Sequence, residues 1–156
     1  TCNLVSINLS AFLGENKTWD WDRLKEAARA AVRQLDNLCD ITQTPIPEAM
    51  HSNQQTRAIG LGIMGLSDVL EKLGYCYESK EAYDLVDQLT EFISYHAIDQ
   101  SADLAKELGS YPTFAGSGWS KGILPIDTVD KLSKDRGVKV KIDQKTRLDW
   151  DGCVRR

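Results

Sequence analysis

The chain has 156 residues, a usual size for one domain, and its balance of 42% hydrophobic and 27% charged residues is that of an ordinary soluble globular protein. Its net charge of -4 argues against a nucleic-acid partner, because binding to phosphates needs a basic face. No apolar run approaches the roughly 18 residues of a membrane span and no signal peptide opens the chain, so we expect a cytoplasmic protein without a membrane partner.

The first two elements are predicted from the spacing of apolar residues. Residues 2–9 partly alternate apolar and polar side chains, which predicts a short strand. From residue 20 to residue 39 apolar side chains recur every three or four positions, which predicts a helix. Asp20 suits the start of this helix, where the helix dipole favours negative charge. The Thr-Pro-Ile-Pro run at residues 44–47 ends it.

Two further helices are expected in the middle of the chain. The spacing of apolar residues predicts one helix over residues 53–73, with Gly74 as its stop. A long helix follows from Ser79, a good N-cap, to Leu108. Its length suggests a kink or break near residues 99–101.

The last third of the chain contains shorter elements. Residues 110–122 are predicted to form a loop, and Asp127 is expected to cap a short helix that runs to Arg136. Residues 138–142 alternate apolar residues with lysine, which predicts a small exposed strand, and a last helix is expected from about residue 150. The whole chain is therefore predicted to be mostly α-helical, with one or two short strands.

Three glycines match the G-x-G-x-x-G fingerprint of dinucleotide-binding folds, namely Gly60, Gly62 and Gly65. That fingerprint requires a strand directly before it, but residues 52–59 are mostly polar. The acidic residue expected at a strand end roughly 20 positions later is also missing. We therefore interpret these glycines as small residues that let a helix pack tightly against a neighbour. A nucleotide-binding module that uses them remains the alternative.

Cysteine and histidine give no pattern of a metal site. No two cysteines form a C-x-x-C pair, and the two histidines, His51 and His96, lie far apart in the sequence. Four cysteines in a chain of this size indicate a reducing compartment. They are Cys2, Cys39, Cys76 and Cys153.

Several stretches resemble one enzyme family. Residues 2–9, Cys-Asn-Leu-Val-Ser-Ile-Asn-Leu, resemble the C-N-L-G-S-I-N-L strand of ribonucleotide reductase large subunits, apart from Val5 in place of glycine. The sequence is also similar to the family's A-V-R-x-L-D-N, P-I-P-E and R-x-I-G-L-G-V-M-G motifs, in that order, at residues 31–37, 45–48 and 57–65. The match continues at residues 93–95, 103–107, 122–128 and 146–151.

The resemblance implies a fold and an activity. The fold is α/β, and residues 1–156 would be part of a ten-stranded α/β barrel domain, incomplete at both ends. The implied activity is reduction of ribonucleotides to deoxyribonucleotides for DNA synthesis by thiyl-radical chemistry. Within this family the glycines Gly60, Gly62 and Gly65 are expected in a packing helix, and this chain alone is expected to reduce nothing.

Cys2 is the candidate catalytic residue. Its residue type and position alone favour a buried small side chain at the start of a strand, which is common for cysteine. The resemblance implies instead that Cys2 is one of two cysteines that reduce the substrate and close a disulfide, with its partner outside this chain. Cys39, Cys76 and Cys153 match no redox position of the family and are interpreted as ordinary thiols.

The resemblance also implies partners and cofactors. No cofactor or metal is expected on this segment, whereas the whole enzyme would need a radical source and ATP or deoxynucleotide effectors. The radical source would be a metal-containing small subunit or adenosylcobalamin. The expected partners are the remainder of the large subunit, the ribonucleotide substrate and a thioredoxin- or glutaredoxin-type reductant, with no direct DNA binding. A non-catalytic helical interaction domain is the second alternative.

Overall fold

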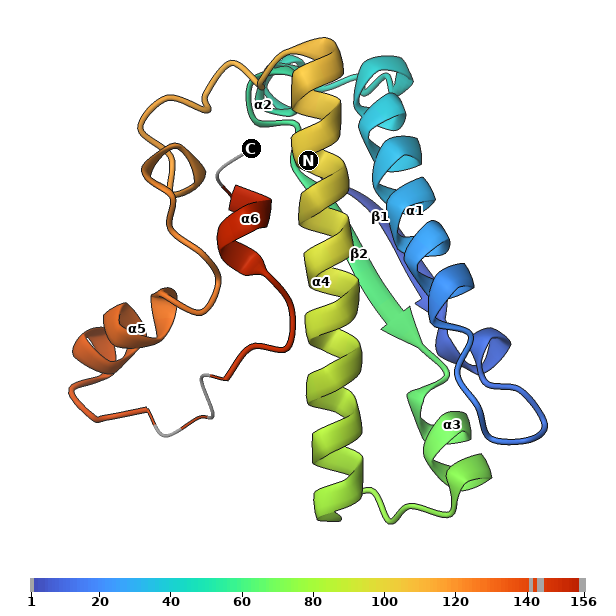
Figure 1. Cartoon of the computed structure of the whole chain (residues 1–156). Helices are drawn as coiled ribbons and strands as arrows, with labels where there is room; N and C mark the ends of the chain where they lie inside the picture. The colour runs from blue at the N-terminus through green and yellow to red at the C-terminus, as the bar shows by residue number, and fades with distance from the viewer. Residues whose placement is uncertain (1, 141, 143–144, 155–156) are drawn as a thin grey trace.

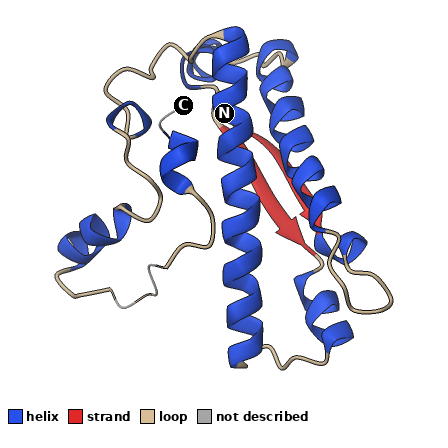
Figure 2. Ribbon diagram, viewed as in Figure 1, coloured by secondary structure: helices blue, strands red, loops and turns tan. Residues whose placement is uncertain are grey.

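The computed structural model describes residues 2–140, 142 and 145–154, and within them the chain is mostly helical with one two-stranded sheet (Figures 1 and 2). This confirms the predicted balance of helix and strand. The elements in order are β1 (Asn3–Asn8), the 3-10 helix η1 (Leu9–Phe12), α1 (Trp21–Ile41), α2 (Pro47–Thr56), β2 (Ile59–Met64), α3 (Leu66–Leu73), α4 (Lys80–Leu108), the 3-10 helix η2 (Trp119–Lys121), α5 (Thr128–Arg136) and α6 (Trp150–Val154).

The first strand and the first helix form where the sequence predicts them. Asp20 is the N-cap of α1, and its side chain accepts a hydrogen bond from the backbone N–H of Arg23 at 3.0 Å. The apolar stripe of α1 is buried at Leu24, Ala28, Ala31 and Leu35, whereas Leu38 on the same stripe is exposed. The helix ends at Ile41, two residues beyond the expected boundary.

The prediction of one helix over residues 53–73 is wrong. The structure divides this stretch into the end of α2, the strand β2 and the short helix α3. Ile59 and Ile63 fit the helical spacing, but together with Leu61 they also alternate with the glycines, which is the period of a strand. Glycine disfavours both states, so the local sequence does not decide between them. Pairing with β1, more than fifty residues away, favours the strand.

The sheet is a parallel pair joined through helices. Asn3 of β1 pairs with Ile59 of β2, and the register continues to Asn8 and Met64. Parallel neighbours need a crossover connection, which here consists of α1 and α2. α1 packs against both strands and so covers one face of the sheet.

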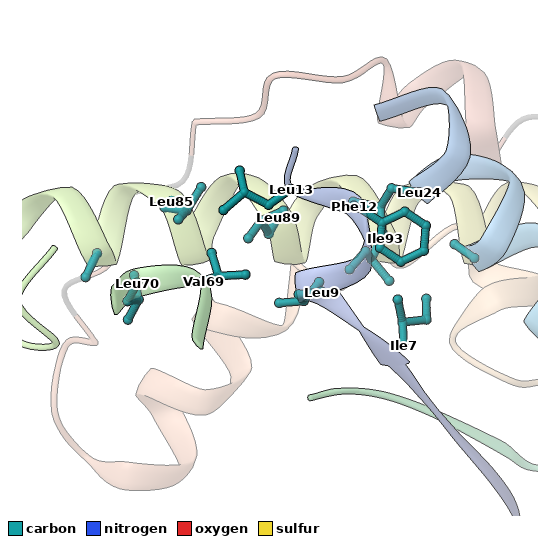
Figure 3. Close-up of a cluster of buried hydrophobic side chains, with 12 residues drawn as sticks. Ile7, Leu9, Phe12, Leu13, Leu24, Val69, Leu70, Leu85, Leu89 and Ile93 are labelled. Atoms are coloured by element: carbon teal, nitrogen blue, oxygen red, sulfur yellow. The ribbon is translucent and has the colours of Figure 1, made fainter. Parts of the chain in front are cut away.

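The apolar core lies between the end of β1, η1 and the helices α1, α3 and α4 (Figure 3). Leu9, Leu24, Val69 and Leu89 are at most 1% exposed and come from four different elements. The other members of this core cluster are Ile7, Phe12, Leu13, Ala28, Leu70, Ala82, Leu85 and Ile93.

The long helix α4 is continuous from Lys80 to Leu108, so the break expected near residues 99–101 is absent. Ser79 caps it as predicted, because its hydroxyl accepts a hydrogen bond from the backbone N–H of Ala82. At the start of the region where a break was expected, the carboxylate of Asp99 forms an ion pair with Arg29 of α1, at 2.6 Å. Packing along α1 thus supports this helix through its second half.

Two predictions in the last third need correction. α5 begins at Thr128, but the side chain of Asp127 does not cap it and instead accepts a hydrogen bond from the backbone N–H of Leu124 at 2.8 Å. The strand predicted over residues 138–142 is not formed by Val138, Lys139, Val140 or Ile142, while residue 141 lies outside the described residues. The N–H of Val140 bonds to the hydroxyl of Ser133 rather than to a neighbouring strand.

No helix among the described residues is long and apolar enough to cross a membrane.

Candidate functional site

Cys2 lies directly before β1, and its side chain is exposed. Its thiol donates a hydrogen bond to the backbone carbonyl of Asn3, with 3.6 Å between sulfur and oxygen. Residue type and position alone favoured a buried cysteine at the start of the strand, and that expectation is therefore wrong. None of the four cysteines forms a disulfide in the structure.

The two faces of the sheet differ in what covers them. Side chains alternate along a strand, so Cys2, Leu4 and Ser6 share one face while Asn3, Val5 and Ile7 share the other. On the second face Ile7 is 6% exposed, because α1 packs there. On the first face Leu4 is 77% exposed. Cys2 therefore belongs to a face of the sheet that the described residues leave open.

The strand next to Cys2 presents glycines on this open face. Gly60 pairs with Leu4 and Gly62 pairs with Ser6. A Cβ atom at Gly60 would lie 2.4 Å from Cδ2 of Leu4 and 3.4 Å from the sulfur of Cys2. Glycine at position 60 thus accommodates the side chain of Leu4, and a larger residue there would clash with Leu4 and approach the sulfur of Cys2.

This placement differs from a phosphate-binding turn. In the dinucleotide fingerprint the glycines follow a strand and open a helix, whereas Gly60 and Gly62 lie inside β2 and pair with β1. Only Gly65 lies at the strand-to-helix turn, with a positive φ of 74°. A Cβ there would lie 2.5 Å from Oδ1 of Asn8, so its space is already filled by the chain itself.

The start of β1 is tied to the end of α1 by the side chain of Asn3. Its amide nitrogen donates to the sulfur of Cys39 at 3.7 Å, and its amide oxygen accepts from the hydroxyl of Thr42 at 3.5 Å. Cys39 is buried, which raises the pKa of its thiol, although the hydrogen bond from Asn3 opposes the rise. A buried thiol with a raised pKa is a poor nucleophile, in keeping with an ordinary structural role.

The start of β2 is tied to the same end of α1 by Arg57. The guanidinium donates to the carboxylate of Asp36 at 2.9 Å and to the carboxylate of Asp40 at 2.5 Å. These hydrogen bonds raise the pKa of Arg57 further above its ordinary value and lower the pKa of Asp40. Sequence reasoning missed this contact. The i, i+4 spacing of the two aspartates places both carboxylates on one side of the helix, which could have indicated a shared cation. The sequence does not show which cation, because Arg57 follows only after the turn and α2.

Among the described residues, no group of three or more histidine, cysteine, aspartate or glutamate side chains could hold a metal ion. The two histidines are not brought together: His51 lies in α2, and His96 lies in α4, where its ring contacts the rings of Phe92 and Tyr95. The site is therefore built from one exposed thiol, a glycine-lined strand beside it and polar contacts that fix both strands on α1.

The sequence was compared with known proteins. A protein-family model described as "Ribonucleotide reductase, barrel domain" matches residues 1–156. The "Ribonucleoside-diphosphate reductase subunit alpha" of Chlamydia pneumoniae is 44% identical over 150 residues, which make up 96% of this chain and 14% of that protein. The subunit of the same name in Helicobacter pylori is 42% identical over 155 residues, or 97% of this chain and 18% of that protein.

A vertebrate protein is also similar. The "Ribonucleoside-diphosphate reductase large subunit" of Danio rerio is 39% identical over 134 residues, or 86% of this chain and 17% of that protein. The chain thus spans less than a fifth of the length of each of these relatives.

Proposed function

Because this chain belongs to the family of ribonucleotide reductase barrel domains, we propose that it forms the part of a large catalytic subunit that brings one reducing thiol to a ribonucleotide. The thiol is that of Cys2. The complete enzyme would convert ribonucleoside diphosphates to deoxyribonucleotides, which is what the names of the relatives indicate for those proteins.

The observation that carries this proposal is the exposed thiol of Cys2 on the open face of the sheet, beside the glycine strand. A redox pair must approach closely, with Cα atoms roughly 4.4–6.8 Å apart. Because the sulfur of Cys2 is exposed, on a face of the sheet that the described residues leave open, a second cysteine from a segment outside this chain can reach it. A cysteine buried in the core, such as Cys39 or Cys153, could not meet a partner in this way.

The electron balance explains why two thiols are needed. Replacing the 2′ hydroxyl of the sugar by hydrogen and releasing it as water consumes two electrons and two protons. Two thiols supply both when they close a disulfide. The disulfide must then be reopened by thiol–disulfide exchange with an external dithiol, and exposure of Cys2 gives such a reductant access. A thioredoxin- or glutaredoxin-type protein fits this role.

Other parts of the enzyme are proposed to lie outside this chain. The described residues do not fit a metal ion, so we assign no radical-generating metal to them. The radical source, whether a small metal-containing subunit or adenosylcobalamin, and the nucleotide effectors would bind elsewhere. The 156 residues by themselves are expected to give no deoxynucleotide from ribonucleotide, because they contain one thiol of the pair.

The proposal is tested by Cys2→Ser in the complete large subunit, with Cys76→Ser as the matched control because Cys76 is also exposed. Deoxynucleotide formation is measured over many turnovers with a dithiol protein as reductant. We expect Cys2→Ser to abolish turnover, since a serine hydroxyl cannot close a disulfide, and Cys76→Ser to retain it.

Full turnover by Cys2→Ser would overturn the proposal. It would favour a non-catalytic helical interaction domain, the alternative that the sequence left open. Equal loss in both variants would also contradict a specific role for Cys2.

A further inference from the structure

We propose that Arg57 is a positioning residue for the thiol of Cys2, because its guanidinium fixes the start of β2 on the end of α1. The proposal rests on the proposed redox function of Cys2. Arg57 does not contact the sulfur itself, so its effect is transmitted through the strand that flanks the thiol.

The guanidinium of Arg57 forms a dense set of contacts for a side chain that is still 24% exposed. Its Nε donates to Oδ1 of Asp36 at 2.9 Å, and its Nη2 donates to the backbone carbonyl of Asp36 at 2.9 Å. The remaining carboxylate, that of Asp40, accepts from Nη1 at 2.5 Å and from Nη2 at 3.1 Å. The planar fork of arginine is therefore held by two consecutive turns of α1.

The backbone of Arg57 is also constrained. Its φ of 47° and ψ of 42° place it in the left-handed region, which a residue with a side chain rarely adopts. Its N–H donates to the carbonyl of Asn53 at 2.9 Å, which ends α2. Only Ala58 separates this turn from the first paired residue of β2, so the guanidinium contacts fix where β2 begins.

The start of β2 sets the surroundings of Cys2. Ile59 is the first residue of β2 to pair with β1, and its partner Asn3 directly follows Cys2. Gly60, one residue further, is the position whose Cβ would lie 3.4 Å from the sulfur. Asn3 is itself tied to the same end of α1, through Cys39 and Thr42. A displaced β2 would therefore displace the start of β1 with it, and so change the position of the thiol relative to the second cysteine of the proposed pair.

Arg29 provides a matched comparison, because it lies in α1, the helix whose carboxylates Arg57 contacts. It also binds two carboxylates, those of Asp99 and Asp103, at 2.6 and 2.7 Å, and its side chain is 22% exposed. These contacts join α1 to α4 rather than to the sheet. Replacing either arginine by lysine keeps the charge and loses the planar fork. The two variants therefore differ mainly in which interface they loosen.

The experiment compares Arg57→Lys with Arg29→Lys in the complete large subunit, at a temperature well below unfolding. It measures kcat and KM for the ribonucleotide, and the midpoint potential of the disulfide that includes Cys2, with Cys2→Ser as the blank. For Arg57→Lys we expect kcat to fall about tenfold through misplacement of the thiol, with KM changed less than about twofold. A tenfold less favourable disulfide closure corresponds to a potential less negative by about 30 mV.

Arg29→Lys is expected to lower the unfolding temperature while leaving kcat and the potential unchanged. If Arg57→Lys leaves both quantities unchanged, or if Arg29→Lys changes them equally, the positioning role is overturned. A variant that does not fold is replaced by Asp40→Asn, which removes one exposed arm of the contact and should shift both quantities in the same direction. A folded Asp40→Asn protein with unchanged kcat and potential would likewise overturn it.

The result for Cys2→Ser separates the two proposals. Loss of turnover in Cys2→Ser with no change in Arg57→Lys leaves the redox function intact and removes only the positioning role. Full turnover in Cys2→Ser removes both.

Discussion

Two regions of the molecule are held to the long helix α4 by different forces. Residues 3–93 pack through apolar side chains, and the core cluster extends from Ile7 to Ile93. The described part of residues 110–154 contributes no side chain to that core cluster, and it contacts α4 through hydrogen bonds to the carboxylate of Glu91 and a ring contact between Trp150 and Tyr95. In Figure 1 this second region lies on the other side of α4 from α1 and the sheet.

Glu91 receives donors from four groups. The backbone N–H of Arg147 donates at 2.6 Å, the backbone N–H of Leu148 at 3.2 Å, and the indole N–H of Trp150 at 3.2 Å. The guanidinium of Arg147 adds an ion pair at 3.0 Å. Burial opposes ionisation of Glu91, but these hydrogen bonds lower its pKa overall.

The comparison shows two ways to fix a segment. Apolar burial is spread over many close-packed side chains that unfold together, so the loss of one central side chain should weaken the whole unit. A single charged acceptor is local, so its loss should release only the segment that donates to it. The end of β1 is fixed by the first mechanism through Ile7, whereas the starts of both strands are held on α1 by polar contacts.

The largest effect is expected from Leu89→Ala, which removes a side chain that is 1% exposed at the centre of the core (Figure 3). Deletions of this kind cost about 2–5 kcal/mol of unfolding free energy. The loss should appear throughout residues 3–108 in chemical denaturation followed by helix content. Leu108→Ala, at a position that is 61% exposed in the same helix, is the control and should be nearly neutral. Equal effects at the two positions would contradict the core described here.

An intermediate effect is expected from Glu91→Ala. Hydrogen bonds to a charged group contribute about 1.5–3 kcal/mol, so the amide protons of Arg147 and Leu148 should exchange about 10- to 100-fold faster. Exchange in β1 and α1 should remain slow, because the apolar core is untouched. Asp87→Ala is the matched control: Asp87 pairs with the same arginine but is 59% exposed, and such pairs contribute about 0–1 kcal/mol. Unchanged exchange in Glu91→Ala would show that other contacts hold this segment.

The smallest effect concerns acid, which should weaken the two regions at different pH. Burial lowers the pKa of His96 from its ordinary 6.5, with Lys25 and Arg29 acting in the same direction and Asp99 and Glu26 against it. A histidine with a lowered folded pKa binds protons more readily when unfolded, so its stabilising contribution is lost as pH falls below about 6.5. The contribution of Glu91 is present above its ordinary value of 4.5 and is lost only as pH falls through its lowered pKa.

Hydrogen exchange measured from pH 7 downward therefore should show the helix pair α1 and α4 weakening before the contact between Glu91 and Arg147. His96→Phe should flatten the first change and leave the second. Coincident loss of both regions, or an unchanged slope in His96→Phe, would contradict this order.

Local signals in the sequence determined the helices that have clear caps and long apolar stripes. Asp20 and Ser79 sit at the predicted starts of α1 and α4, and each accepts the expected backbone hydrogen bond. These elements could be predicted because caps and periodic burial act within a few residues of one another. The motifs at residues 2–9 and 57–65 also pointed to the family that the comparisons show.

Tertiary contacts decided the structure of those segments for which the sequence allowed two predictions or gave a wrong one. Residues 59–64 fit a helix and a strand about equally, and only pairing with β1 made them β2. The contacts of Arg57 with Asp36 and Asp40, and the placement of Cys2 beside Gly60, likewise exist only in the folded chain. Residues that lie far apart in the sequence have no local signature of their contact, because its stabilisation exists only once the chain has folded.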